Sequence, residues 1–307
     1  MSVTKEIDRR SVGVSLLAPA KLNLSLRICG RRADGYHLLS SLVCFTDWGD
    51  RLHFSVSDKD QIICDGAYAK TLQSAGGDTL IASSRDALRD AGLIPSIPVR
   101  IHITKNIPLG AGLGGGSADA AATLQGLLSV FQCEADHNKL SDIALSLGAD
   151  VPVCLTGGVV LMEGIGEQLE VLSSYARASD TPWLVLSHPG IHANTKEVFR
   201  TFALSVKNTS QPALDKAALK AALQNGNWPA LIGDGNDLIE PACQAYPDLA
   251  DFQAIFYQHA KEAKARSMSG SGACFFALYD GPSKAEYARH ALEKAGYWAQ
   301  ACPILIK

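Results

Sequence analysis

Residues 108–119 read Pro108-Leu109-Gly110-Ala111-Gly112-Leu113-Gly114-Gly115-Gly116-Ser117-Ala118-Asp119, with five glycines in seven positions. Glycine loses more conformational entropy on ordering than any other residue, so a connector without a ligand would not use so many. Because glycine has no side chain, its backbone N–H group can approach an anion closely. The stretch therefore predicts an anion-binding loop.

The segments on either side of this loop predict a strand and a helix. Residues 99–104 alternate apolar and polar side chains, as a half-buried strand does. Ser117 is a favourable helix N-cap, and a run rich in alanine and leucine follows it to about Gln132. A glycine loop before a helix N-terminus directs N–H donors and the positive end of the helix dipole toward one point, which favours phosphate. A flexible start to the helix, without a ligand, is the alternative.

The spacing of the glycines argues against several known types of phosphate-binding loop. Gly110, Gly112 and Gly115 satisfy G-x-G-x-x-G, which alone indicates a dinucleotide site only weakly. Residues 105–108 separate the strand from the loop, and no acidic residue ends a second strand where a Rossmann fold needs one. The loop continues with Gly-Ser instead of the Lys-Ser or Lys-Thr of a Walker A motif. The H-R-D and D-F-G motifs of protein kinases are also missing from the sequence.

Length and charge restrict the class of protein. With 307 residues and 47% hydrophobic content, the chain can bury a large core and is expected to form two domains. The polar stretch at 173–181 predicts the boundary, which gives domains at 1–178 and 179–307. The net charge is −3 and basic residues form no block, so the sequence predicts no nucleic-acid or membrane partner. We expect a small-molecule ligand.

The cysteines and the N-terminus indicate the compartment. Eight cysteines are scattered without a C-x-x-C pair, which argues against a zinc site and a disulfide framework. The first residues carry charges but no apolar core of a signal peptide, and no apolar run is long enough to cross a bilayer. We expect a cytoplasmic protein.

The hydrophobic pattern predicts a mixed α and β chain. Strands are expected at 14–28, 41–56, 99–104, 159–162, 169–172, 183–187, 273–279 and 298–306. Helices are expected at 79–91, 117–132, 139–147, within 195–264, and at 284–295. The second half of the chain predicts an α+β sandwich.

The strand near the start of the chain carries polar residues at alternate positions. Side chains alternate between the two faces of a strand, so Lys21, Asn23 and Ser25 share one face and the leucines between them share the other. This polar face places a cation beside an amide. An ordinary surface strand explains the same pattern equally well.

Polar residues also stand out in two turns. Asp150 lies after a predicted helix and before Pro152, which we expect to stop further helix, and an aspartate there is more often a solvated cap than a catalyst. His188 and His192 are four residues apart, but a proline and a glycine between them prevent a shared helical face. We interpret them as loop histidines and assign no metal ligands.

Five motifs carry a resemblance that covers residues 18–274. They are P-A-K-L-N-L at 19–24, R-x-D-G-Y-H at 32–37, the glycine loop, G-A-D-V-P at 148–152 and S-G-S-G-A at 269–273. In this order they resemble the 4-diphosphocytidyl-2-C-methyl-D-erythritol kinase family of the GHMP kinase superfamily. The glycine loop alone is similar to homoserine, mevalonate and galactose kinases as well. The residues before Leu16 lie beyond these motifs, and we assign them no role.

The resemblance implies a fold and an activity. The expected fold is the α+β, two-domain GHMP kinase fold, with a ribosomal-protein-S5-domain-2-like ATP-binding domain at 1–178 and a ferredoxin-like α/β sandwich at 179–307. The expected reaction is ATP-dependent phosphorylation of the 2-hydroxyl of 4-diphosphocytidyl-2-C-methyl-D-erythritol, in the non-mevalonate route to isoprenoids. ATP with Mg²⁺ and a substrate linked to cytidine diphosphate are implied ligands. Monomer and homodimer both remain open.

The resemblance also implies roles for the polar residues. By matching motif, Asp150 is the general base, Lys21 is the cation beside it, and Asn23 completes the polar face as a substrate contact. A carboxylate near an ammonium stays ionised and can accept the proton of an attacking alcohol. The ammonium can offset charge on the transferring phosphoryl group.

Substrate contacts are implied at three further residues. Tyr36 is expected to stack on the cytosine ring, and His37 is expected to hydrogen-bond its edge. A ring that stacks on a base contributes about 1–3 kcal/mol. Thr195 matches a substrate-contacting threonine at a helix start. Without the resemblance, a Tyr-His pair on a turn and a plain N-cap explain these residues.

The nucleotide side is implied mainly by the loop. Residues 108–118 are expected to bind ATP, together with Leu80 and Lys105, although an apolar helix residue and a strand-end lysine need no ligand. Gly270 and Gly272 are expected to supply a second set of backbone donors. A tight turn before a buried strand accounts for these two glycines equally well.

Three functions therefore compete. The first is the cytidyl-diphosphate kinase, the second is another kinase of the superfamily with a different acceptor, and the third is a catalytically silent nucleotide-binding protein. Lys21 and Asp150 argue against the third, because a silent protein can lose them freely.

Overall fold

The structure is a computed structural model that describes residues 13–74, 76–77, 79–176, 181–204 and 210–306. The described residues group into two compact units. Unit 1 consists of the described residues within 13–18, 49–106 and 116–155. Unit 2 consists of the described residues within 19–48, 107–115 and 156–306. The expected boundary between residues 178 and 179 lies outside the described residues and stays a prediction. Unit 2 contains residues from before and from after this expected boundary.

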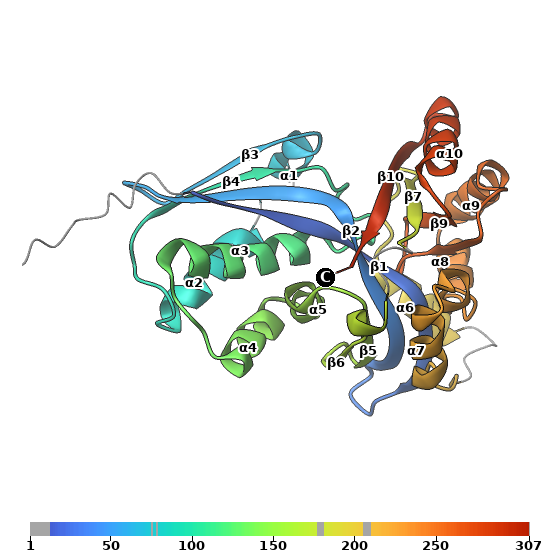
Figure 1. Ribbon diagram of the computed structural model, residues 1–307, viewed down its shortest axis with the longest axis horizontal. Coiled ribbons are helices and arrows are strands. Elements are labelled where there is room, and N and C mark those ends of the chain that lie inside the picture. The colour runs from blue at the N-terminus through green and yellow to red at the C-terminus, as the bar shows by residue number, and fades with distance from the viewer. Residues whose placement is uncertain (1–12, 75, 78, 177–180, 205–209, 307) are drawn as a thin grey trace, which may run out of the picture. The chain divides into compact units, whose positions relative to one another are not determined.

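Unit 1 is a sheet with helices packed against it. Its strands are β3 (Gln61–Asp65), β4 (Val99–Thr104) and the unit 1 parts of β1 (Val14–Arg31) and β2 (His37–Val56). Strand β4 runs antiparallel to β2 and parallel to β3. Its helices are α1 (Ala69–Ser74), α2 (Thr79–Asp90), α3 (Gly115–Phe131), α4 (His137–Leu147) and α5 (Val151–Thr156). Helices α2, α3 and α4 lie on one side of this sheet (Figure 1).

Unit 2 is built around a second group of paired strands. Strand β2 pairs with β5 (Val160–Gly164), which pairs with β6 (Gln168–Val171), and β2 also pairs with β10 (Trp298–Leu305). The order continues from β10 to β7 (Trp183–His188), β9 (Phe275–Tyr279) and β8 (Ala265–Met268), all antiparallel. The helices are α6 (Thr195–Leu204), α7 (Lys216–Gln224), α8 (Ile239–Ala245), α9 (Pro247–His259) and α10 (Pro282–Lys294).

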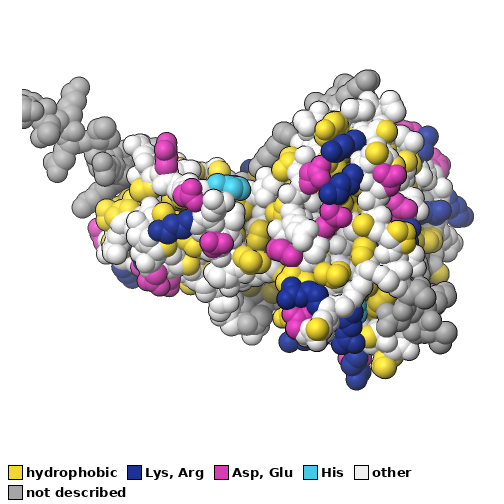
Figure 2. All heavy atoms as spheres, turned by 90° about the horizontal axis from the view of Figure 1, so that it is seen from below, with side chains coloured by type: hydrophobic (Ala, Val, Ile, Leu, Met, Phe, Trp, Pro, Cys, Tyr) yellow, Lys and Arg dark blue, Asp and Glu magenta, His cyan; other side chains and the backbone are white. Residues whose placement is uncertain are grey.

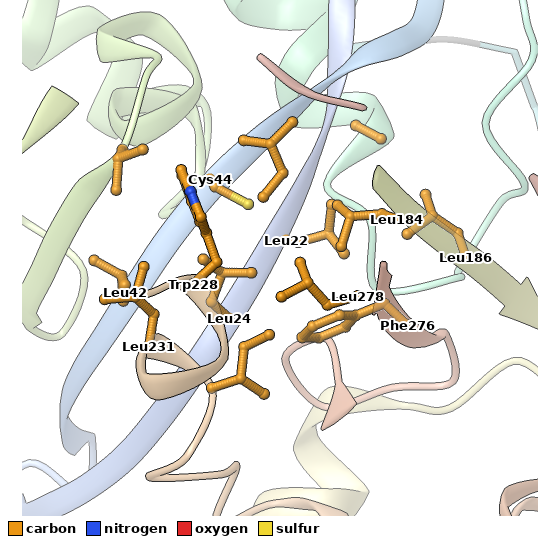
Figure 3. Packing of buried hydrophobic residues seen from close by; sticks show 14 of the residues in the cluster. Leu22, Leu24, Leu42, Cys44, Leu184, Leu186, Trp228, Leu231, Phe276 and Leu278 are labelled. Atoms are coloured by element: carbon orange, nitrogen blue, oxygen red, sulfur yellow. The ribbon is translucent and has the colours of Figure 1, made fainter. Parts of the chain in front are cut away.

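A buried apolar cluster in unit 2 sets the orientation of β1 (Figure 3). Leu22 and Leu24 of β1 are fully buried and pack with Leu42 of β2, Leu184 of β7 and Trp228. Because strand side chains alternate, burying these leucines forces the intervening polar residues to the opposite face. The apolar core therefore decides which way the candidate site residues of β1 point.

The acidic and basic side chains are interspersed on the face of the molecule shown in Figure 2. In the part of the chain that the structure describes, no helix combines the length and the apolar character needed to cross a bilayer.

The main differences from the sequence-based expectations are at helix starts. Helix α3 begins at Gly115, so Ser117 lies inside the helix and is not its N-cap. Pro152 does not stop a helix; it lies in the first turn of α5, where a missing backbone N–H is tolerated. The short elements β3, α1, α5 and β8 were not expected, because segments of four to six residues carry too little periodicity to be recognised.

Helix α3 packs so closely against β2 that one of its positions has no room for a side chain. A Cβ added at Gly126 would overlap the ring of Phe54. We predict that Gly126→Ala destabilises the protein, because overpacking costs about 1–3 kcal/mol and exceeds the roughly 1 kcal/mol that alanine gains over glycine in a helix. Urea denaturation measures the change. Ser129→Ala, at an exposed position of α3, should change stability by less than about 0.5 kcal/mol, and a Gly126→Ala protein as stable as the wild type would contradict this packing.

Candidate active site

The glycine loop packs against three other segments of unit 2. Gly110, Gly112 and Gly114 have φ values of 70°, 76° and 65°, in the left-handed region that side chains disfavour. A Cβ at Gly110 would overlap the imidazole of His192, and one at Gly112 would overlap the Gly272 carbonyl oxygen. At Gly114 it would lie 3.1 Å from the Cβ of Lys21. The glycines therefore serve close packing of protein segments, a reason for them that the sequence did not reveal.

Hydrogen bonds tie the loop to β1 and to the turn at 269–272. The Lys21 N–H donates to the Leu113 carbonyl at 2.9 Å, and the Cys274 N–H donates to the Ala111 carbonyl at 3.0 Å. The Ser269 hydroxyl donates to the Gly112 carbonyl at 3.0 Å. Carbonyl groups of the loop are thus held by the protein, and this fixes the loop's path.

Gly270 and Gly272 belong to this tight turn. The Gly272 N–H donates to the Ser269 carbonyl at 3.0 Å, so it is engaged within the turn, in agreement with the alternative that the sequence left open. The Gly270 carbonyl accepts from the Asn236 amide at 2.7 Å. The proposed role of the two glycines toward phosphate stays a prediction. Asn236 was missed in the sequence because no motif marks a residue that supports a turn from another segment.

Lys21 and Asn23 form a buried polar pair on β1. The Lys21 ammonium donates to Asn23 Oδ1 at 3.1 Å, and the two residues are 4% and 2% exposed. The Asn23 amide nitrogen donates to the Ser41 hydroxyl at 2.8 Å, which in turn donates to the Ser25 carbonyl. The Asn23 N–H donates to the Ser269 hydroxyl at 3.2 Å. The predicted pairing of a cation with an amide on one face is confirmed, although the face is buried and not a solvated surface.

Comparison with protein-family models gives two matches in the chain. Residues 79–158 match the "GHMP kinases N terminal domain", and residues 212–297 match the "GHMP kinases C terminal" domain. The curated 4-diphosphocytidyl-2-C-methyl-D-erythritol kinase of Rhizobium etli is 40% identical over 92% of this chain and 91% of its own length. The chain belongs to the 4-diphosphocytidyl-2-C-methyl-D-erythritol kinase family of the GHMP kinases.

Solved structures agree with this membership. A crystal structure of a 4-(cytidine 5'-diphospho)-2C-methyl-D-erythritol kinase is 33% identical, with a TM-score of 0.75, and covers 95% of this chain and 99% of its own. A homoserine kinase from Cytophaga hutchinsonii, 20% identical with a TM-score of 0.65, covers 100% of this chain and 97% of its own and shares the fold. The expected α+β, two-domain GHMP kinase fold is confirmed.

In this GHMP kinase, His37 is held in an aromatic cluster and Tyr36 is exposed. The His37 ring stacks on Phe199 of α6, with centroids 5.1 Å apart, and meets Phe202 edge-on. Burial, and then the charge of Arg31, lowers the pKa of His37. Its Nε2 is buried and has no hydrogen-bond partner among the described residues. Tyr36 is 63% exposed. Phe199 was missed because an apolar residue on a helix normally indicates core packing.

Thr195 is the first residue of α6, but it does not cap the helix. The side chain of Asn194 accepts from the Lys196 N–H at 2.9 Å, which is the usual N-cap interaction. The Thr195 hydroxyl instead lies 2.9 Å from the Ser271 hydroxyl. This contact connects the start of α6 to the turn at 269–272. Thr195 is therefore not the N-cap of α6, which was the alternative explanation for this residue.

Asp150 and Leu80 belong to unit 1. Asp150 precedes α5, and its carbonyl accepts from the Cys154 N–H at 3.2 Å. Leu80, in α2, lies 3.4 Å from where a Cβ would stand on Gly116, in the first turn of α3. The pairing of Asp150 with Lys21, which belongs to unit 2, stays a prediction.

Lys105 lies in a buried charge cluster of unit 1. Its ammonium contacts the carboxylates of Asp50 and Asp119, both fully buried, at 2.5 Å. Burial alone would lower the pKa of Lys105, but the two carboxylates outweigh it and raise the pKa above its usual value. The cluster joins the end of β4 to α3. Its contact with a nucleotide stays a prediction.

Metal ligands and disulfides were not expected. No group of three or more histidine, cysteine, aspartate or glutamate side chains among the described residues is arranged to hold a metal ion. None of the eight cysteines, all of which lie among the described residues, forms a disulfide bond.

The loop geometry predicts the effect of one methyl group. In Gly112→Ala, the new Cβ overlaps the Gly272 carbonyl, and the left-handed backbone costs a further 1–2 kcal/mol or so. We expect the Kd for ATP to rise at least about tenfold, as measured by calorimetry. Gly235→Ala is the matched control, because Gly235 has φ 75° and no atom of the described residues within 4 Å of an added Cβ. Equal ATP affinity in both variants would show that the loop contact does not shape the site.

The Lys105 cluster predicts a large effect on stability. Lys105→Met leaves two buried carboxylates without their cation, and breaking a buried pair in this way typically costs about 3–5 kcal/mol. Urea denaturation tests this, with Lys59→Met, an exposed lysine of the same unit, as control. If Lys105→Met instead keeps wild-type stability and raises only the KM for ATP, the cluster is dispensable for folding and Lys105 acts on the nucleotide.

Proposed function

We propose that this chain transfers the γ-phosphoryl group of ATP to the 2-hydroxyl of 4-diphosphocytidyl-2-C-methyl-D-erythritol. The observation that carries the proposal is the 40% identity, over nearly the whole length of both chains, to a curated kinase that is named for this substrate. The ordered polar pair on β1 and the loop that packs against it support the same activity.

The reaction requires one proton acceptor and a site for charge. The 2-hydroxyl oxygen forms a bond to the γ-phosphorus while the bond from the γ-phosphorus to the bridging oxygen breaks, and ADP leaves. Asp150 accepts the hydroxyl proton, and Lys21 offsets negative charge on the phosphoryl oxygens. Asn23 holds the Lys21 ammonium in place through its amide oxygen. Such phosphoryl transfers depend mainly on positioning and electrostatic stabilisation.

We propose that ATP binds to the glycine loop. The loop at 110–117 and the first turn of α3 supply backbone N–H groups and the positive end of a helix dipole. Mg²⁺ is proposed to enter with the nucleotide and to neutralise phosphate charge. No acidic cluster suited to a metal occurs among the described residues, which fits an ion held mainly by phosphate oxygens and water.

We propose that the acceptor binds at the segments around His37. Tyr36 is exposed and can stack on the cytosine ring, and His37, whose Nε2 has no hydrogen-bond partner among the described residues, is proposed to hydrogen-bond the edge of the base. Phe199 supports the His37 ring by stacking on it. Thr195, whose hydroxyl meets Ser271, is proposed to contact the substrate.

The proposal extends to the compartment and the assembly. Eight cysteines without a disulfide bond fit a reducing compartment, so we place the enzyme in the cytoplasm, as a monomer or a homodimer. We retain the division into domains at 1–178 and 179–307.

One assay separates the competing activities. The purified protein is incubated with Mg-ATP and each of the cytidylated methylerythritol, mevalonate, homoserine and galactose, and ADP release is followed. We predict turnover with the first substrate only. Turnover with another acceptor, or with none, would refute the proposal.

The same assay tests the proposed base. Asp150→Asn should lower kcat roughly 10²–10⁴-fold, because a general base typically contributes that much, while the fold and the Kd for ATP stay near wild type. Asp142→Asn, an exposed aspartate on α4, is the matched control and should keep wild-type kcat. An Asp150→Asn enzyme with undiminished kcat would remove Asp150 from the mechanism.

A further inference from the structure

His192 lies beside the glycine loop, in the segment between β7 and α6. The sequence indicated only a loop histidine there. Its Nδ1 occupies the space where Gly110 would carry a side chain, so the imidazole rests against the first left-handed position of the loop. Three residues later, Thr195 contacts the turn at 269–272. The segment thus borders both the loop and the turn that supports it.

The His192 ring has few competing partners. Its side chain is exposed, and among the described residues the ring has no hydrogen-bond or ion-pair partner. Residues 107–115 and the turn at 269–272 contain no charged or titratable side chain. Nearby on its own segment are Lys196 and Glu197, and Glu197 is paired with Arg200. The ring is therefore open to a ligand.

The neighbouring histidine does not share this property. His188 is 6% exposed, and burial lowers its pKa to about 4, with a smaller contribution from the charge of His192. His188 is therefore neutral between pH 6 and 8. An imidazole in water is the side chain that changes charge in that interval. Of the two histidines, only His192 has an exposed side chain beside the loop.

We propose that His192 is a phosphate-binding residue at the Gly110 end of the loop, which contacts the diphosphate group of a bound ligand. This inference rests on the proposed function. The loop offers only backbone N–H groups there, and a protonated imidazole adds a full charge and a charge-assisted hydrogen bond. Both ATP and the cytidylated acceptor contain a diphosphate, and His192 contacts the loop proposed for ATP and precedes by three residues Thr195, which is proposed for the acceptor. Either ligand can therefore supply it.

The test compares His192→Gln with the wild type, because glutamine keeps a polar side chain of similar reach but cannot gain a proton. Calorimetry measures the Kd of ADP and, separately, of CDP at pH 6.0 and pH 8.0. We expect the variant to bind one of them about fivefold more weakly at pH 6.0 and within about twofold of the wild type at pH 8.0. Loss restricted to ADP assigns the contact to ATP, and loss restricted to CDP assigns it to the acceptor.

Proton linkage gives a readout that loop packing alone would not change. Titrations at pH 7 in two buffers of different ionisation enthalpy should show that His192→Gln takes up fewer protons on binding than the wild type. His290→Gln, which changes an exposed histidine of α10, is the control and should match the wild type. If His192→Gln keeps the wild-type affinities and proton uptake for both nucleotides, the inference is wrong. Because these titrations need no turnover, they remain decisive even if the substrate assay refutes the proposed activity.

Discussion

The site depends on close backbone contact at the three left-handed glycines of the loop. His192, the turn at 269–272 and Lys21 each fill the space that a side chain would take. Hydrogen bonds from the backbone of Lys21 and Cys274, and from the Ser269 hydroxyl, hold loop carbonyls in place. Since all these segments belong to unit 2, the shape of the loop is set within one compact unit. A loop whose path is fixed by such contacts loses less conformational entropy when it presents its N–H groups to a phosphate.

Lys21 and Lys105, the two buried lysines among the predicted site residues, have different structural roles. Lys21 lies on the polar face of β1, where the burial of alternating leucines directs it, and donates to the amide oxygen of Asn23. Lys105 bridges two buried carboxylates and links β4 to α3. A sequence cannot distinguish these environments, because Asp50 and Asp119 are 55 and 14 residues away from Lys105.

Local patterns predicted the parts of the fold that depend on neighbours in sequence. The loop, the long strands and the shared face of Lys21 and Asn23 follow from glycine content and from alternation of period two. Features that depend on long-range contact were missed. They are the stacking of Phe199 on His37, the hydrogen bond from Asn236 to the turn at 269–272, and the packing of His192 against Gly110. The start of α6 at Thr195 agrees with the sequence, but its N-cap is the neighbouring Asn194, because two residues suited to capping stand next to each other there. Roles in catalysis came from the family resemblance and not from periodicity.

The central claim is that the backbone of the glycine loop grips the phosphates of ATP. Hydrogen–deuterium exchange of the loop amides at 110–117, with and without a non-hydrolysable ATP analogue, tests this claim most directly. The account predicts that exchange of these amides slows on binding, while exchange in the hairpin of β5 and β6 is unchanged. If the analogue binds and the loop amides exchange at the same rate as in the free protein, the loop is not the phosphate site and the account fails.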